Sequence, residues 1–257
     1  MAALAKPVIA GNWKMHMGPN EARAWADAFT AATPAGERSI VVFPPAVTLA
    51  VLGWALRERA DILLGVQNIH WEAKGAFTGE TSAPIAREAG ARIALIGHSE
   101  RRHVFGETDD EVTRKVKAAL AHDLDAMVCV GETIDERRAG RVDEVILRQL
   151  DAALAAVPKD AIMRLSVAYE PVWAIGTGET ATPADASAAH STLRRRLAER
   201  LGATDSHLVR ILYGGSVKPD NADALLDAPE VDGLLVGGAS LDPAGFARIA
   251  AAGLGPR

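Results

Sequence analysis

Three titratable residues lie where predicted strands end, and together they could move protons on one small molecule. Lys14, His98 and Glu170 each follow a short apolar run of the chain. A carboxylate held among apolar neighbours gains basicity, because burial disfavours its charged form. The three side chains would provide a general base, a weak acid and a fixed cation. Such a set could carry general acid–base chemistry on a bound substrate.

The position of His98 suggests which protonation state it would use. It stands in Gly97-His98-Ser99-Glu100, where a predicted strand gives way to a short polar helix. The partial positive charge of a helix N-terminus and the nearby charge of Lys14 both disfavour an imidazolium. We therefore expect the pKa of His98 to lie below its reference value of about 6.5. The neutral ring could then donate a hydrogen bond.

Two glycine-rich segments suggest that the small molecule carries a phosphate. Gly214-Gly215-Ser216 and Gly237-Gly238 follow the last two predicted strands. Glycine lets backbone N–H groups approach an anion, and barrel enzymes often bind phosphate after strands seven and eight. One such pair alone could be a tight turn, but two pairs in these two loops favour a phosphate site.

These residues must be positioned by a repeated strand and helix unit, because eight short apolar runs recur about every 32 residues. Their length and β-branched content are typical of strands buried on both faces of a parallel sheet. The runs are Lys6–Trp13, Ser39–Pro45, Asp61–Gln67, Ala91–Gly97, Asp125–Gly131, Met163–Pro171, His207–Gly215 and Val231–Gly238.

Helix signals fill the gaps between these runs. Thr108 and Glu111 form a capping box, and Thr182-Pro183 is an N-cap followed by a first-turn proline, with Gly202 placed to end that helix. Eight alternating units without a break predict an α/β fold, a single (β/α)₈ TIM barrel domain over residues 1–257. A doubly wound sheet is disfavoured, because Gly11-Asn12-Trp13-Lys14 after the first run is not a dinucleotide-binding fingerprint.

Composition narrows the partners and the compartment. Hydrophobic residues make up 49% and charged residues 24%, which excludes disorder. The net charge of -5 argues against nucleic-acid or membrane-surface binding. The single cysteine, Cys129, excludes a disulfide framework and a multi-cysteine zinc site, and it is expected to be a core residue. The N-terminus resembles no signal peptide, and no run is long enough to span a membrane. With a single thiol, we expect a protein of the reducing cytoplasm.

Six motifs, in order along nearly the whole chain, resemble those of triosephosphate isomerases. They are Gly11–Lys14, Gly75–Glu80, Gly97–Arg102, Ala168–Gly178, Tyr213–Val217 and Asp232–Leu241. The resemblance implies interconversion of dihydroxyacetone phosphate and D-glyceraldehyde 3-phosphate through an enediolate, in glycolysis and gluconeogenesis, with no cofactor and no metal. This family is itself a standard example of a carboxylate base working with a neutral histidine.

The resemblance also implies a role for each motif residue. Glu170 would be the base, His98 the neutral electrophile, and Lys14 would counter charge on the enediolate and the phosphate. The other substrate contacts implied are Asn12, Gly176, Ser216, Gly237 and Gly238. Pro171–Thr177 resembles the family's closing lid, which would keep water from the intermediate.

The long segment Asn68–Thr81 matches the family's docking loop, so we expect a homodimer in which Thr78 approaches the partner subunit's Asn12 and Lys14. The sequence departs from the family's pattern at His16 and at Ile69-His70-Trp71. These departures affect the expected loop shape and not the chemistry.

Two alternative functions remain at this point. Another phosphate-handling barrel would share the late glycines but would not need the lid. A silent barrel would be expected to lose Lys14, His98 or Glu170.

Overall fold

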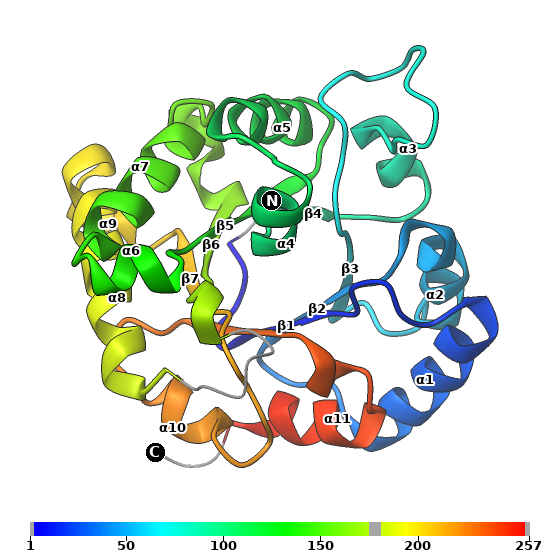
Figure 1. The fold of residues 1–257 in the computed structure, drawn as a ribbon. Coiled ribbons are helices and arrows are strands. Elements are labelled where there is room, and N and C mark those ends of the chain that lie inside the picture. Colours follow the sequence, from blue (N-terminus) through cyan, green and yellow to red (C-terminus); the bar gives the residue numbers. More distant parts are fainter. Residues whose placement is uncertain (1–2, 175–180, 255–257) are drawn as a thin grey trace.

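Eight parallel strands close into a barrel in the computed structural model, which describes residues 3–174 and 181–254 (Figure 1). Each strand pairs with its neighbour in sequence, and β8 closes the barrel by pairing with β1. The strands are β1 (Val8–Asn12), β2 (Ser39–Phe43), β3 (Ile62–Val66), β4 (Ile93–Ile96), β5 (Asp125–Val130), β6 (Leu165–Tyr169), β7 (Arg210–Tyr213) and β8 (Gly233–Val236). Each lies within one of the eight predicted runs, so the predicted barrel is confirmed.

Helices surround the barrel as an outer ring in Figure 1. The α-helices are α1 (Pro19–Ala32), α2 (Leu49–Ala55), α3 (Ala83–Glu88), α4 (Ser99–Val104), α5 (Asp109–Ala121), α6 (Ile134–Arg138), α7 (Val142–Leu154), α8 (Pro183–Leu201), α9 (Ala203–Ser206), α10 (Ala222–Leu226) and α11 (Pro243–Ala251). Short 3₁₀ turns are η1 (Ala46–Thr48), η2 (Lys159–Arg164), η3 (Val172–Ala174) and η4 (Gly238–Ser240).

The predicted helix ends are confirmed at α5 and α8. The Thr108 hydroxyl accepts from the Glu111 amide at 3.3 Å, and the Glu111 carboxylate accepts from the Thr108 amide at 2.8 Å. Thr182 caps α8 in the same reciprocal way with Asp185, and Gly202 is the C-cap of that helix. Such caps satisfy N–H groups that have no partner inside the helix, and each stabilises by about 1 kcal/mol.

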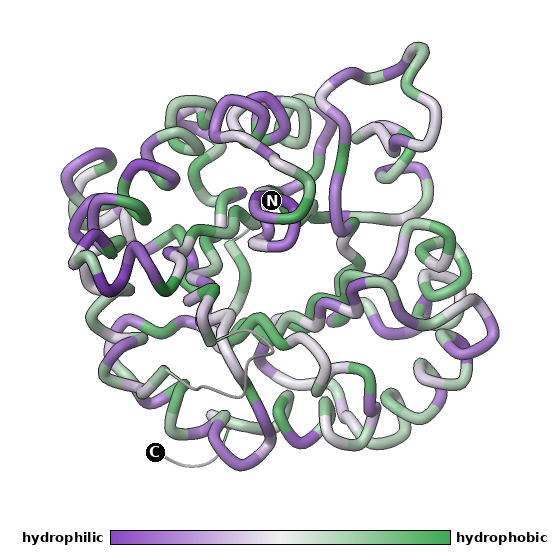
Figure 2. Tube along the Cα trace, viewed as in Figure 1, coloured by the Kyte–Doolittle hydropathy of each residue, from purple (hydrophilic) through white to green (hydrophobic). Residues whose placement is uncertain are grey.

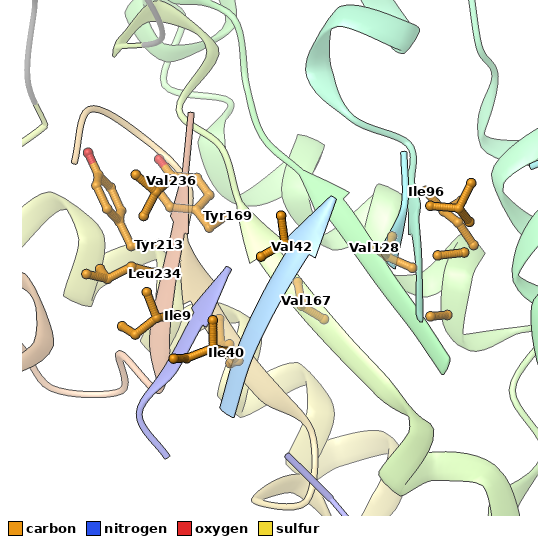
Figure 3. Close-up of a cluster of buried hydrophobic side chains, with 14 of the residues drawn as sticks. Ile9, Ile40, Val42, Ile96, Val128, Val167, Tyr169, Tyr213, Leu234 and Val236 are labelled. Carbon is orange, nitrogen blue, oxygen red and sulfur yellow. The ribbon is translucent and has the colours of Figure 1, made fainter. Parts of the chain in front are cut away.

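Alternate residues of the strands pack on opposite sides of the sheet. One cluster of buried side chains includes outward-facing strand residues and residues of the surrounding helices, and Figure 3 shows its strand members, such as Ile9, Val42 and Val167. The second cluster fills the barrel interior and includes Val8 and Cys129. Cys129 is therefore the predicted core residue, and burial raises the pKa of its thiol well above the usual value. Figure 2 shows hydrophobic colour along the barrel and hydrophilic colour on much of the outer ring.

The segment between β3 and α3 departs from the ring. Drawn in cyan in Figure 1, it extends beyond the surrounding helices. Its own aromatic side chains pack on one another: the His70 ring lies 4.2 Å from Trp71 and 4.1 Å from Phe77, between ring centroids. The His70 amide donates to Thr81 O at 2.8 Å, which ties the two ends of the loop together. The loop that the sequence singled out is thus an ordered projection.

Candidate functional site

The period of the strands places several predicted site residues at the mouth of the barrel. Val8 and Ala10 of β1 face the interior, so Asn12, two residues further, has the same phase. Ala168 of β6 faces inward, and Glu170 follows with the same phase. The inner face of parallel strands thus leads directly to polar side chains at their carboxyl ends, where active sites of such barrels lie.

The alternation of side chains along β4 would point His98 away from the barrel interior, so a turn in the backbone is needed to bring it to the cavity. Leu95 of β4 faces the interior, so an unbroken strand would turn His98 away from it. Gly97 has a φ of 72°, a left-handed conformation that other residues rarely adopt, and α4 begins directly after His98. The turn brings His98 to the cavity, and the Glu100 amide donates to its Nδ1 at 3.2 Å.

A cavity of about 400 Å³ at this end of the barrel brings the predicted residues together. It is lined by Asn12, Lys14, His98, Glu170, Gly214, Gly215, Ser216, Val217, Lys218, Leu235, Gly237, Gly238 and Ala239. Of the other predicted site residues, Gly176 lies outside the described residues, and Thr78 does not line this cavity. The late glycines lie beside the cation: a Cβ on Gly237 would be 3.7 Å from Lys14 Cε.

Glu170 and His98 form a direct pair inside this cavity. The Glu170 Oε1 lies 3.0 Å from His98 Nε2, and its Oε2 accepts from the Ser99 amide at 2.8 Å. Glu170 is 2% exposed and His98 is 6% exposed. Burial by itself raises the pKa of Glu170, but the charge and hydrogen bond of His98, the Ser99 amide and the charge of Lys14 outweigh it, so this pKa is lowered. The Glu170 carboxylate is therefore ionised, and both of its oxygens have hydrogen-bond partners.

The same contact overturns the expected pKa of His98. Burial is the largest influence and lowers it, yet the charge of Glu170, their hydrogen bond and the charge of Glu100 together raise the pKa above its usual value, with Lys14 opposing them. The prediction of a lowered pKa is wrong for this arrangement. It took account of Lys14 and the helix terminus, whereas the partner 3.0 Å away lies 72 residues further along the chain and gave no local signal.

Lys14 is held in an uncommon backbone conformation by side chains on both sides. Its φ is 50°, which costs a non-glycine residue about 1–3 kcal/mol unless its surroundings enforce it. Asn12 Oδ1 accepts from the Lys14 amide at 3.0 Å, and Gln67 Nε2 donates to the Lys14 carbonyl at 2.8 Å. Lys14 Nζ in turn lies 2.6 Å from Glu100 Oε1. Sequence reasoning missed Gln67, although a polar residue directly after the end of β3 was a usable signal.

The start of the predicted lid rests on a buried carboxylate. Glu132 accepts a hydrogen bond from the Trp173 indole at 2.9 Å and contacts the Tyr169 hydroxyl at 3.1 Å. The Arg137 guanidinium lies over the Trp173 ring, 4.5 Å from its centroid. Sequence reasoning did not single out Glu132. The rest of the predicted lid, from Ile175 onward, lies outside the described residues.

A larger hollow lies at the other end of the barrel but lacks the same chemistry. It measures about 810 Å³ and includes Lys6, His207 and Asp232, which precede strands β1, β7 and β8. Residues there precede the strands, so the hollow is at the amino-terminal face, where barrels carry stabilising residues. In the ranges 3–174 and 181–254, no group of three or more His, Cys, Asp or Glu could hold a metal ion. No helix in these ranges is long and apolar enough to cross a membrane.

Known proteins match the chain along almost its whole length. The sequence model of the family described as triosephosphate isomerase matches residues 7–253. A triosephosphate isomerase of Chloroflexus aurantiacus is 50% identical over 244 residues, covering 95% of this chain and 97% of that protein. One of Thermoanaerobacter pseudethanolicus is 46% identical, covering 96% and 99%. The crystal structure of triosephosphate isomerase from Bartonella henselae has a TM-score of 0.86 and 40% identity, covering 96% of this chain and 98% of that one.

Proposed function

Because the chain belongs to the triosephosphate isomerase family, and so interconverts dihydroxyacetone phosphate and D-glyceraldehyde 3-phosphate in glycolysis and gluconeogenesis, we propose that Glu170, His98 and Lys14 carry the reaction. The family match sets aside the two alternatives, another phosphate-handling barrel and a silent one. One observation supports the assignment above the others: a base, a weak acid and a cation from three strand ends line one cavity of about 400 Å³.

Glu170 acts as the base. It takes a proton from C1 of dihydroxyacetone phosphate, and the electron pair of that bond moves through the new double bond onto the oxygen of C2. A hydroxyl proton moves from the oxygen of C1 to the oxygen of C2 through His98, and the Glu170 carboxyl group returns its proton to C2, which leaves the aldehyde at C1. In the described arrangement Glu170 contacts His98 Nε2 and the Ser99 amide, so it must turn from these partners to reach a carbon of the substrate.

His98 stabilises the oxygen and moves hydroxyl protons. Its Nδ1 accepts from the Glu100 amide, so the proton of the neutral ring sits on Nε2, the atom that faces Glu170. An imidazolium would place an N–H against that amide N–H. Once Glu170 leaves Nε2, the two largest influences that raise the pKa of His98 are removed, while burial and the charge of Lys14 still lower it against the weaker effect of Glu100. The ring is then neutral when it donates to the substrate carbonyl.

The phosphate group binds at the cation side of the cavity. Lys14 provides charge, Asn12 holds the Lys14 backbone and borders the substrate, and Ser216, Gly237 and Gly238 provide backbone groups. Gly176 contributes from the lid. The lid closes over the enediolate because water and free rotation would let the intermediate expel its phosphate. The reaction needs no cofactor and no metal.

We further propose that the chain is one domain that forms a cytoplasmic homodimer without nucleic-acid or membrane partners. A second hollow of about 190 Å³ adjoins the site along Asn12, Lys14 and His98, and its rim includes Met15 and Phe105, which are 94% and 69% exposed. Large apolar side chains that are exposed around one hollow support an interface at this place. The tip of the projecting loop, with Thr78, would enter this hollow on the partner subunit.

Turnover of D-glyceraldehyde 3-phosphate, coupled to NADH oxidation by a dehydrogenase that consumes dihydroxyacetone phosphate, tests the function. Glu170→Gln removes the base but keeps the size of the side chain, and it should lower kcat by about 10²–10⁴-fold. Glu199→Gln, an exposed residue of α8, is the matched control and should leave kcat unchanged. Absent turnover in the unaltered protein contradicts the function. A Glu170→Gln variant within tenfold of it contradicts the assigned base.

A further inference from the structure

Lys218 is a second cation of the cavity. It follows β7 and lines the same space as Lys14 and Ser216. The two lysines differ in their partners. Lys14 Nζ lies 2.6 Å from a carboxylate of Glu100, whereas no carboxylate of the described residues lies within ion-pair distance of Lys218. Among the described residues that line this cavity, Glu170 is the one carboxylate, and it is engaged by His98. The charge of Lys218 is thus left uncompensated beside the predicted phosphate-binding backbone.

The backbone under this lysine is fixed by one asparagine. Asn221 Oδ1 accepts from the Lys218 amide at 2.8 Å, and Asn221 Nδ2 donates to the Ser216 carbonyl at 3.1 Å. Val217, between Ser216 and Lys218, is buried, and Pro219 has a fixed φ and restricts the backbone of Lys218 before it. The turn therefore holds the backbone of Lys218 near Ser216, while the exposed lysine side chain can move on its four-carbon stem.

We propose that Lys218 recruits and helps to hold the phosphate group of the substrate. The proposal deepens the proposed function and rests on it. The chain carries a formal net charge of -5, so a dianionic substrate is repelled by the protein as a whole and depends on local positive charge at the cavity. Lys218 provides that charge without having to break an ion pair first.

The expected effect is on binding and is sensitive to salt. No charge develops on the phosphate group during proton transfer, so an interaction there is the same in the ground state and the transition state, and it lowers KM without changing kcat. An exposed charge pair is screened within about 10 Å at 0.1 M salt. We therefore expect a factor of about 3–10 at low ionic strength, and a smaller factor at high ionic strength.

The test compares charge variants with a phosphorylated and an unphosphorylated probe. Lys218→Gln should raise the KM for D-glyceraldehyde 3-phosphate and the inhibition constant of inorganic phosphate by the same factor, about 3–10 near 10 mM ionic strength. Lys218→Arg should restore both values, and Lys218→Glu should raise them further. Turnover of glyceraldehyde, which lacks the phosphate, should not change. Lys117→Gln, an exposed lysine of α5 outside the cavity, makes the same charge change as a control.

The outcomes separate this proposal from the proposed function. Lys218→Gln values that match those of Lys117→Gln would overturn the role of Lys218, while turnover by the unaltered protein would still support the isomerase. A fall in kcat with KM unchanged would also overturn it. Should the unaltered protein lack turnover, the proposed function fails, and calorimetric titration with inorganic phosphate then decides on Lys218. A Lys218→Gln loss of affinity there supports the proposal, and equal affinity rejects it.

Discussion

Replacing Gly214 by alanine would test how tightly the base must be placed. A Cβ at this position would lie 2.9 Å from Glu170 Cγ and 3.2 Å from the Tyr169 carbonyl oxygen. Carbon atoms in contact prefer about 3.5–4.0 Å, so the first distance is short by about 0.6 Å or more. The Tyr169 carbonyl cannot withdraw easily, because it belongs to β6 and accepts from the Gly214 amide at 2.7 Å. The Glu170 side chain must therefore move.

The displacement sets the size of the effect. A misplacement of about 1 Å can cost about 10²-fold in rate. A shift of about 0.6–1 Å at Glu170 should lower kcat by about 10–100-fold, which corresponds to about 1.4–2.7 kcal/mol of activation free energy. Inhibition by inorganic phosphate should stay within about threefold of the unaltered protein, because the nearest atoms that the new Cβ would meet belong to Glu170, Tyr169 and Leu235 and not to the phosphate-binding residues. Steady-state kinetics of isomerisation and phosphate inhibition measure both quantities.

Gly18→Ala is a suitable control, because its Cβ would meet nothing closer than 3.8 Å. Overpacking can itself destabilise by about 1–3 kcal/mol, so thermal unfolding must show that Gly214→Ala is folded at the assay temperature. An unchanged kcat in the folded variant would refute the steric reasoning. A parallel loss of kcat and phosphate affinity would show that the whole loop had moved, and not the base alone.

Three further changes test other parts of the site. His98→Gln should raise the pKa of Glu170, because burial remains while the charge that lowers it is lost; ¹³C titration of the carboxyl group measures this, and a lower or unchanged midpoint speaks against the pairing. Deletion of Ile175–Gly178 should leave a folded protein that releases phosphate and methylglyoxal, and an unchanged ratio of elimination to isomerisation would contradict the protective role of the lid. Thr78→Arg should give monomers in sedimentation with a large loss of turnover; a fully active monomer would exclude the shared site.

The barrel was predictable because its signals are local and repeated. Runs such as Asp125–Gly131 carry the apolar content of a strand buried on both faces, and β5 occupies Asp125–Val130. Thr108 and Thr182 marked helix starts by side-chain chemistry that acts within four residues. The closing pair, β8 against β1, joins residues more than 220 positions apart, and only the count of eight units indicated it.

The sequence indicated which residues belong to the site, but not which of them contact one another. Glu170, His98 and Lys14 were each marked by standing at a strand end, and the cavity contains all three. Gln67 and Glu132 act through hydrogen bonds to residues more than 20 positions away. The position of Gln67 after β3 could have marked it as a site residue, but nothing near either residue in the sequence indicates its partners. The predicted direction of the His98 pKa shift was wrong for the same reason, because that direction depends on which charged group lies nearest.

The pairing of Glu170 with His98 explains how a buried base can wait in its ionised form. A carboxylate removed from water without partners costs several kcal/mol and tends to take up a proton instead. Here the Ser99 amide and His98 satisfy both of its oxygens, so its pKa stays low and the base is ionised at neutral pH. In the proposed reaction, a substrate that brings its carbonyl to His98 Nε2 takes over that contact, and Glu170 loses the charge and the hydrogen bond that lower its pKa most. Burial, the largest influence on Glu170, then raises its pKa against the weaker effects of the Ser99 amide and Lys14, and so strengthens it as a base only when a proton on carbon is within reach.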